Sequence, residues 1–212
     1  MKASPGTWRE VASRDELRAL VPHPNTRNAN KVRRRLDAMD RAFLDASSFW
    51  LVATSSEDGR CDVSPKGDPA GSVLVLDEQT LALPDRPGNR RMDGYLDLLE
   101  NPHVGLLFLI PGRGDTLRVN GRAKLVSDAP FFDNMVVEGH RPRLVLVVEV
   151  EEVFYHCSKA FLRSRMWQPG DWDPDRAPSR AEIAKALERP EESLEDLERY
   201  YGPSYGENLY CD

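Results

Sequence analysis

Two short segments of the sequence place basic side chains where the chain is expected to turn. Lys66 lies in the first, Ser64-Pro65-Lys66-Gly67-Asp68, and Arg90 and Arg91 follow Asn89 in the second. An arginine pair binds a phosphate well, because each guanidinium donates charge-assisted hydrogen bonds. The chain as a whole is acidic, with a formal net charge of -6, so these basic residues are not background charge. The sequence therefore predicts a phosphate-binding site.

A helix is expected to begin at the arginine pair. Asn89 suits the N-cap position, and Met92, Leu96 and Leu99 recur on one helical face. A helix start offers free backbone N–H groups and the positive end of the dipole. Two solvated arginines there would oppose the dipole by about 0.3 to 1 kcal/mol each, so a bound anion is the favoured interpretation. For Lys66, binding and a plain turn role are equally compatible with the sequence.

Composition narrows the class of protein. The 212 residues include 40% hydrophobic ones, enough for one domain with additional segments at both ends. The acidic net charge argues against nucleic acid or anionic membranes as the main partner. No apolar run approaches the roughly 18 to 20 residues of a membrane span, and the start, Met1-Lys2-Ala3-Ser4-Pro5-Gly6, lacks the apolar stretch of a signal peptide.

Cysteine and histidine usage gives two further expectations. The three cysteines form no C-x-x-C pair and are interpreted as reduced thiols, which predicts a cytoplasmic protein. The four histidines share no metal-ligand spacing, so no metal site is expected.

Periodicity and turn residues predict helices at the two ends and strands between them. Helices are expected at residues 13–20, 32–43, 89–101, 129–137, 180–187 and 194–200, and strands at 49–54, 60–64, 72–76, 80–83, 103–110, 115–126 and 144–154. Hairpin-linked strands with few intervening helices favour a mainly β fold with flanking helices, an antiparallel barrel. The expected division is an N-terminal helical segment (1–47), the barrel (48–167) and an acidic helical tail (168–212).

Three strings carry a resemblance to a known family: Leu81-Ala82-Leu83-Pro84-Asp85-Arg86-Pro87-Gly88-Asn89-Arg90-Arg91, Glu100-Asn101-Pro102-His103-Val104-Gly105-Leu106-Leu107-Phe108 and Leu117-Arg118-Val119-Asn120-Gly121-Arg122-Ala123. In this order they resemble the pyridoxamine 5'-phosphate oxidase-like superfamily, whose members are FMN-binding split β-barrels. Segments 62–68 and 157–167 are similar to a bacterial subgroup described as FMN-dependent PPOX-type flavoproteins. The resemblance implies a homodimer with FMN at the interface.

The resemblance also implies roles for particular residues. Arg90 and Arg91, after Asn89, correspond to the family's basic pair that holds the FMN phosphate. Pro84 and Asp85 correspond to positions along the flavin. The remaining implied contacts of the cofactor within this part of the chain are with Ser64, Lys66, Gly67 and Thr116. Thr116 replaces a glutamine of the authentic oxidase, so its contact must differ.

Lys159, Arg163 and Trp167 are spaced i, i+4 and i+8, which predicts one helical face. The resemblance implies that they reach the partner subunit's FMN. The alternative is that the two cations snorkel beside a half-buried tryptophan. Arg118 shares a strand face with Thr116. Its side chain could line the site or could simply be exposed to solvent, and the sequence favours neither. Positive charge from Lys66 or Arg118 would stabilise a reduced flavin.

The expected function is that of an FMN-dependent oxidoreductase acting on an unidentified small molecule. No side chain is an obvious general acid or base. The alternatives are a split barrel that binds deazaflavin or haem, and a non-catalytic flavin-binding dimer. The substrate-phosphate motif of pyridoxamine phosphate oxidase is absent from the C-terminal region, where Pro169-Gly170-Asp171-Trp172-Asp173-Pro174-Asp175 carries three carboxylates that would repel a phosphate. The sequence therefore favours a non-phosphorylated substrate.

Overall fold

A computed structural model describes residues 8–207 and 209–211. The chain separates into two compact units, Met1–Val32 and Arg33–Asp212. The expected boundaries at residues 47 and 167 stay a prediction. The start of the chain, on which the signal-peptide expectation rests, lies outside the described residues. None of the helices formed by the described residues has the length and apolar character that a membrane span needs.

The N-terminal unit contains two short helices, α1 (Arg14–Leu20) and α2 (Thr26–Ala29). The capping interaction expected at the first helix is present, because the Ser13 hydroxyl accepts a hydrogen bond from the Glu16 N–H at 3.2 Å. No residue of either helix is buried within the structure. The helices are therefore held by local caps and not by a core of their own.

The helix expected at residues 32–43 begins later than predicted. The structure has α3 at Ala38–Ala46, and Arg33 instead forms an isolated antiparallel bridge with Val153 of the sheet. Asp37 caps α3 in a reciprocal capping box with Asp40. Asp40 is fully buried and accepts hydrogen bonds from Arg33 at 2.5 and 2.8 Å. The cap and this ion pair end the extended segment and start the helix.

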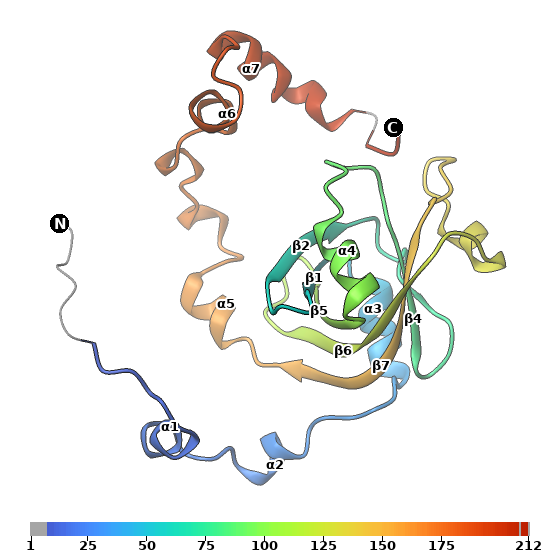
Figure 1. Ribbon diagram of the computed structural model, residues 1–212, viewed down its shortest axis with the longest axis vertical. Coiled ribbons are helices and arrows are strands. Elements are labelled where there is room, and N and C mark those ends of the chain that lie inside the picture. Colours follow the sequence, from blue (N-terminus) through green and yellow to red (C-terminus); the bar gives the residue numbers. More distant parts are fainter. Residues whose placement is uncertain (1–7, 208, 212) are drawn as a thin grey trace. The chain divides into compact units, whose positions relative to one another are not determined.

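The second unit is built on one sheet (Figure 1). Its strands are β1 (Phe49–Ser55), β2 (Cys61–Gly67), β3 (Leu74–Val75), β4 (Thr80–Pro84), β5 (His103–Leu109), β6 (Thr116–Val126) and β7 (Val145–His156). They pair antiparallel in the order β2-β1-β5-β6-β7-β4-β3. The curved sheet leaves β2 and β3 as its two edges within the described residues. This is the expected mainly β fold, an antiparallel split barrel.

Alternation along the strands builds the core. Every second residue of β1 and β5 is buried, including Trp50, Val52, Leu106 and Phe108. The same cluster takes in residues of β4, β6, β7 and α3. Because side chains alternate between the two faces of a strand, one face of the curved sheet forms the barrel interior, while the alternate residues of β1 and β5 are only partly buried or exposed.

The remaining helices flank the sheet. α4 (Asp93–Glu100) packs against β1 and β2, and a 3₁₀ helix (Pro130–Met135) stands where a short α-helix was expected at 129–137. After β7 come α5 (Lys159–Ser164), two 3₁₀ turns (Pro169–Asp171 and Pro174–Arg176), α6 (Arg180–Leu187), α7 (Leu194–Tyr200) and a last 3₁₀ turn (Pro203–Gly206). The bounds of α6 and α7 confirm the predicted pair, which shares a small core of Ala181, Ala184 and Leu197.

The long β6–β7 ladder contains one irregularity that depends on a glycine. The register shifts between Asn120 and Gly121, as at a β-bulge. A Cβ atom on Gly121 would overlap the backbone carbonyl oxygen of Glu149 on β7. Only glycine lets the two backbones approach this closely.

We expect Gly121→Ala to lower the free energy of unfolding by about 1 to 3 kcal/mol or more, because the clash is with backbone that must shift. Gly105→Ala is the matched control in the neighbouring strand. There the nearest atoms would be Asn120 Oδ1 at 3.5 Å and Ala53 Cβ at 3.9 Å, which is ordinary contact. Urea unfolding followed by circular dichroism measures both. Equal losses for the two variants would show that the bulge does not need glycine.

Candidate functional site

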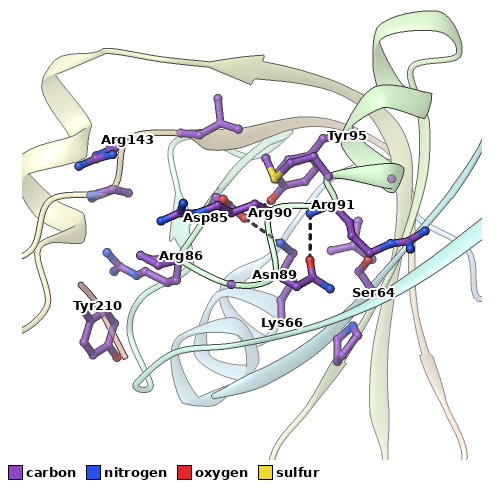
Figure 2. A pocket seen from close by; sticks show the side chains of 18 of the residues that line it. Ser64, Lys66, Asp85, Arg86, Asn89, Arg90, Arg91, Tyr95, Arg143 and Tyr210 are labelled. Atoms are coloured by element: carbon purple, nitrogen blue, oxygen red, sulfur yellow. Dashed lines mark hydrogen bonds and ion pairs between the residues drawn. The ribbon is translucent and has the colours of Figure 1, made fainter. Parts of the chain in front are cut away.

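A cavity of about 950 Å³ opens where β2, the segment that follows β4, and the segment before β7 come together (Figure 2). Residues 62–66 of β2 form one wall, residues 85–95 another, and residues 139–144 a third. Tyr210 and Cys211, near the end of the chain, line it as well. This volume is at the upper end of the usual range for small-molecule and cofactor sites, about 300 to 1,000 Å³.

The cavity gathers positive charge in an acidic chain. Its basic lining residues outnumber its carboxylates: Lys66, Arg86, Arg90, Arg91, Arg141 and Arg143 against Asp62, Asp85 and Asp93. His140 adds an imidazole. Clefts lined by one sign of charge concentrate ligands of the opposite sign. The cavity is therefore suited to an anionic ligand.

The arginine pair lies before α4, not in its first turn, so the predicted N-cap is wrong. α4 begins at Asp93 with Met92 as the N-cap residue, and both Arg90 and Met92 have a φ of 60°. These left-handed residues interrupt the helix that Asn89 was expected to start. Asn89 instead closes a tight turn, its side-chain oxygen accepting the Arg91 N–H at 3.1 Å (Figure 2). The turn, and not the helix dipole, presents the two guanidinium groups.

The two arginines differ in their contacts. Arg91 Nε donates to Asp93 Oδ2 at 2.7 Å, and both side chains are exposed. Within residues 8–207 and 209–211, Arg90 makes no hydrogen bond or ion pair. An exposed pair such as Arg91 with Asp93 contributes little stability and exchanges readily for a better anion. Both guanidinium groups are thus available to a ligand.

A small network crosses the cavity wall between β2, the end of β4 and α4. Lys66 Nζ donates to Asp85 Oδ1 at 2.7 Å, and the Tyr95 hydroxyl donates to the same oxygen at 2.9 Å (Figure 2). The ammonium also lies 4.6 Å from the centre of the Tyr95 ring. Burial, and then the neighbouring Asp85 carboxylate, raise the pKa of the Tyr95 phenol. The network fixes a lysine, a carboxylate and a neutral phenol side by side.

A second cluster at the cavity is built around Arg86 and Tyr210, which lie near each other in Figure 2, and the sequence pattern did not predict the tyrosine. Asp68 accepts hydrogen bonds from Arg86 at 2.7 and 2.9 Å and from the Tyr210 hydroxyl at 2.9 Å. His140 stacks on the Tyr210 ring, with the ring centroids 6.2 Å apart. Asp68 and Arg86 stood within the two basic segments, but Tyr210 is 142 positions from Asp68, and no local pattern links them.

Six of the residues predicted to bind the cofactor line the cavity: Ser64, Lys66, Asp85, Asn89, Arg90 and Arg91. Seven others do not: Gly67, Pro84, Thr116, Arg118, Lys159, Arg163 and Trp167. Gly67 and Pro84 are the immediate strand neighbours of Lys66 and Asp85, so they frame the site without facing it. The other five lie on β6 or beyond β7.

The polar face of β6 makes its own contacts away from the cavity. Arg118 Nε donates to Asn120 Oδ1 at 3.0 Å, and the guanidinium lies 5.3 Å from the centre of the Phe154 ring. Asn120 donates to Glu152 on β7 at 2.7 Å. Thr116, on the same strand face, is buried. Within one chain, Arg118 therefore does not supply charge to the cavity.

The single helical face expected for Lys159, Arg163 and Trp167 is wrong at its last member. α5 ends at Ser164, and Arg165 has a φ of 54°, so the chain turns before Trp167. Trp167 Nε1 donates to the Arg113 carbonyl oxygen at 2.6 Å, while its ring stacks on Phe161. The tryptophan thus fixes the start of the tail to the loop between β5 and β6.

The acidic stretch 169–175 does not line the cavity. Asp171 pairs with Arg165, which lies just before the tail. The repulsion of a substrate phosphate that these carboxylates were expected to cause is therefore not a property of this cavity, whose walls carry several arginines. Across the described part of the chain, no group of three or more His, Cys, Asp or Glu residues is arranged to hold a metal ion.

Comparisons with known proteins bear on this site. A family model described as pyridoxamine 5'-phosphate oxidase matches residues 36–157, more than half of the chain. Among solved structures, HupZ of Group A Streptococcus is 17% identical, over 57% of this chain and 94% of that chain, with a TM-score of 0.45. A putative pyridoxamine 5'-phosphate oxidase of Lactobacillus delbrueckii is 22% identical, over 57% of this chain and 95% of that chain, with a TM-score of 0.44. Curated protein sequences gave no match.

The buried phenol of Tyr95 gives a prediction about alkaline stability. Folding raises the pKa of Tyr95 above its unfolded value of about 10, because the buried site favours the neutral phenol. The contribution of Tyr95 to the free energy of unfolding is therefore complete below pH 10 and is lost as the pH rises from there through the folded pKa. We expect the free energy of unfolding of Tyr95→Phe to fall less steeply above pH 10 than that of the wild type. Urea unfolding between pH 8 and 11 measures it, with the exposed Tyr205→Phe as control. Parallel pH profiles for wild type and Tyr95→Phe would contradict the assignment.

Proposed function

Because the chain belongs to the pyridoxamine 5'-phosphate oxidase family, whose members bind flavin-type cofactors, we propose that it is an FMN-dependent oxidoreductase of a small molecule. The observation that carries the proposal is the basic cavity at the ends of β2 and β4, with Arg90 and Arg91 at its turn. A flavin with a phosphate is an anionic, flat and largely apolar ligand, and such ligands suit large cavities with a few placed polar groups.

The phosphate end of the cofactor fits the turn before α4. The guanidinium groups of Arg90 and Arg91 would bind it, and the Ser64 hydroxyl of β2 lines the same cavity. Ser64 donates to Asp62 at 2.8 Å, which fixes the position of its oxygen. Arginine suits this role because its planar fork matches the geometry of phosphate oxygens.

The Lys66, Asp85 and Tyr95 network would face the ring system. FMN, when bound, supplies the transfer of a hydride or an electron pair. Lys66 provides positive charge, but Asp85 offsets part of it at 2.7 Å. The protein therefore stabilises added negative charge on a ligand less than a lone ammonium would. Tyr95 stays neutral and orients the carboxylate.

The substrate remains to be identified by assay. Arg86, Arg141 and Arg143 also line the cavity, and the acidic residues 169–175 do not, so a negatively charged substrate would be compatible with it. Oxygen uptake with pyridoxine phosphate on flavin-loaded protein distinguishes the family's founding activity from a different oxidation. We further propose that the protein is cytoplasmic, because its three cysteines are an odd number and form no C-x-x-C pair.

Loss of either arginine should weaken FMN binding while the fold is kept, because both side chains lie in an exposed turn. We expect Arg90→Ala or Arg91→Ala to lower the affinity for FMN roughly 10- to 150-fold, which corresponds to about 1.5 to 3 kcal/mol for one charge-assisted contact. Affinity for riboflavin, which has no phosphate, should change little. Fluorescence titration of the apoprotein measures both ligands.

Arg199→Ala is the matched control. Arg199 is an exposed arginine of α7 that pairs only with Glu195 and Asp196 in the described structure, and it does not line the cavity. If the wild type binds FMN and riboflavin equally well, the phosphate is not recognised and the role given to the arginine pair is wrong.

We also propose that the protein is a homodimer. Lys159 and Arg163 of α5, and Trp167 in the turn after it, would contact the FMN of the partner subunit across the interface. Lys159 and Arg163 are exposed and Trp167 is half-buried, and none of them lines the cavity of its own chain. Apolar side chains are also exposed next to the site, on β2 and α4: Val63, Leu96 and Leu99. Burying them against a second copy would remove an apolar surface from water.

Sedimentation equilibrium should therefore give twice the mass of the chain, and Arg163→Ala should weaken FMN binding without altering the cavity of its own chain. Arg176→Ala, in the following 3₁₀ turn, serves as the control. A monomer that retains full FMN occupancy would falsify the shared site.

A further inference from the structure

The end of the chain returns to the cavity. We name residues 209–211 the C-terminal strap. Its Tyr210 hydroxyl donates to Asp68 Oδ1 at 2.9 Å, and the Arg86 guanidinium lies 5.2 Å from the centre of the Tyr210 ring. The His140 ring stacks on the Tyr210 ring, with the centroids 6.2 Å apart. The tyrosine therefore forms part of the cavity wall (Figure 2).

Tyr210 docks on a buried ion pair that has several other partners. The side chains of Asp68 and Arg86 are only 1% and 11% exposed, and they form an ion pair at 2.7 Å. Arg86 also donates to the carbonyl oxygens of Met135 at 2.7 Å and His140 at 3.3 Å. A buried pair with these additional partners is a rigid receptor, since each charged group has its hydrogen bonds satisfied.

The rest of the strap is held weakly. Leu209 is 61% exposed, and Cys211 is exposed, with one hydrogen-bonding contact among the described residues, from its sulfur to His140 Nε2 at 3.5 Å. Burial, followed by the hydrogen bond to Asp68, raises the pKa of Tyr210 to about 12, so the phenol stays a donor at neutral pH. One side chain thus fixes the strap to the cavity, and breaking one contact set would release it.

We propose that the C-terminal strap is a gate of the cavity, with Tyr210 as its latch, and that its release admits and discharges FMN. The proposal rests on the function proposed above. A latch of one phenol on this ion pair closes the cavity beside Arg86 while leaving the turn with Arg90 and Arg91 to bind the phosphate. A gate of this kind changes how fast the cofactor exchanges and leaves its affinity nearly unchanged.

The test compares the rate constants of FMN association and dissociation, measured by stopped-flow fluorescence, in wild type, Tyr210→Phe and Tyr210→Ala. A hydrogen bond to a charged group is worth about tenfold or more in an equilibrium, so Tyr210→Ala should raise both rate constants about tenfold and change the affinity less than about threefold. Tyr210→Phe keeps the ring but loses the hydrogen bond, so its two rate constants should lie between those of the wild type and those of Tyr210→Ala. Tyr205→Ala is the control, because Tyr205 belongs to the same tail but its ring contacts Tyr200 and Tyr201.

Each other outcome overturns the proposal. Unchanged rates in Tyr210→Ala, with FMN still bound, would remove the gate and leave the proposed function standing. A rise in dissociation alone would make Tyr210 a direct contact of the cofactor. An equal effect of Tyr205→Ala would assign the change to the tail as a whole. Failure of the wild type to bind FMN would remove the proposed function and the gate together.

Discussion

The cavity brings several basic side chains close together, so their mutual repulsion must be offset by neighbouring carboxylates. Six basic side chains line one space, and nearly every one whose contacts are described has a carboxylate within hydrogen-bond distance. Asp85 is paired with Lys66, Asp68 with Arg86 and Asp93 with Arg91. The pairs differ in burial: the Asp68 pair is enclosed, the Asp85 pair is half enclosed and the Asp93 pair is exposed. The charge that a ligand can neutralise is therefore concentrated at Arg90 and Arg91.

The fold of the sheet determines where the Lys66–Asp85 pair lies. Asp85 follows the last residue of β4, and its N–H donates to the Leu144 carbonyl oxygen at 2.9 Å, which continues the β4–β7 pairing by one step. Lys66 belongs to β2, at the other edge region of the curved sheet. Curvature brings the two ends together, so one hydrogen bond from Lys66 to Asp85 spans the opening of the split barrel. The cavity is thus located where the sheet does not close.

Local patterns predicted what is decided locally. Caps predicted the bounds of α6 and α7. Turn residues and alternation predicted which consecutive strands pair as hairpins. The start of α4 did not, because Asn89 can cap a helix or close a turn, and the left-handed Arg90 and Met92 decided for the turn. Long-range contacts were out of reach altogether: the docking of Tyr210 on Asp68 joins residues 142 positions apart. The basic wall was predictable at Lys66, Arg90 and Arg91 because both segments resemble one family.

Whether the basic cavity binds FMN is tested most directly by the identity of the chromophore that is released when the purified protein is denatured. Absorption and mass of the released molecule identify it without any assumption about substrate. We expect the released molecule to be FMN, in amounts stoichiometric with the chain, and we expect protein that was purified empty to take up FMN. Release of haem or a deazaflavin, or a chain that neither carries nor takes up FMN, would contradict this expectation.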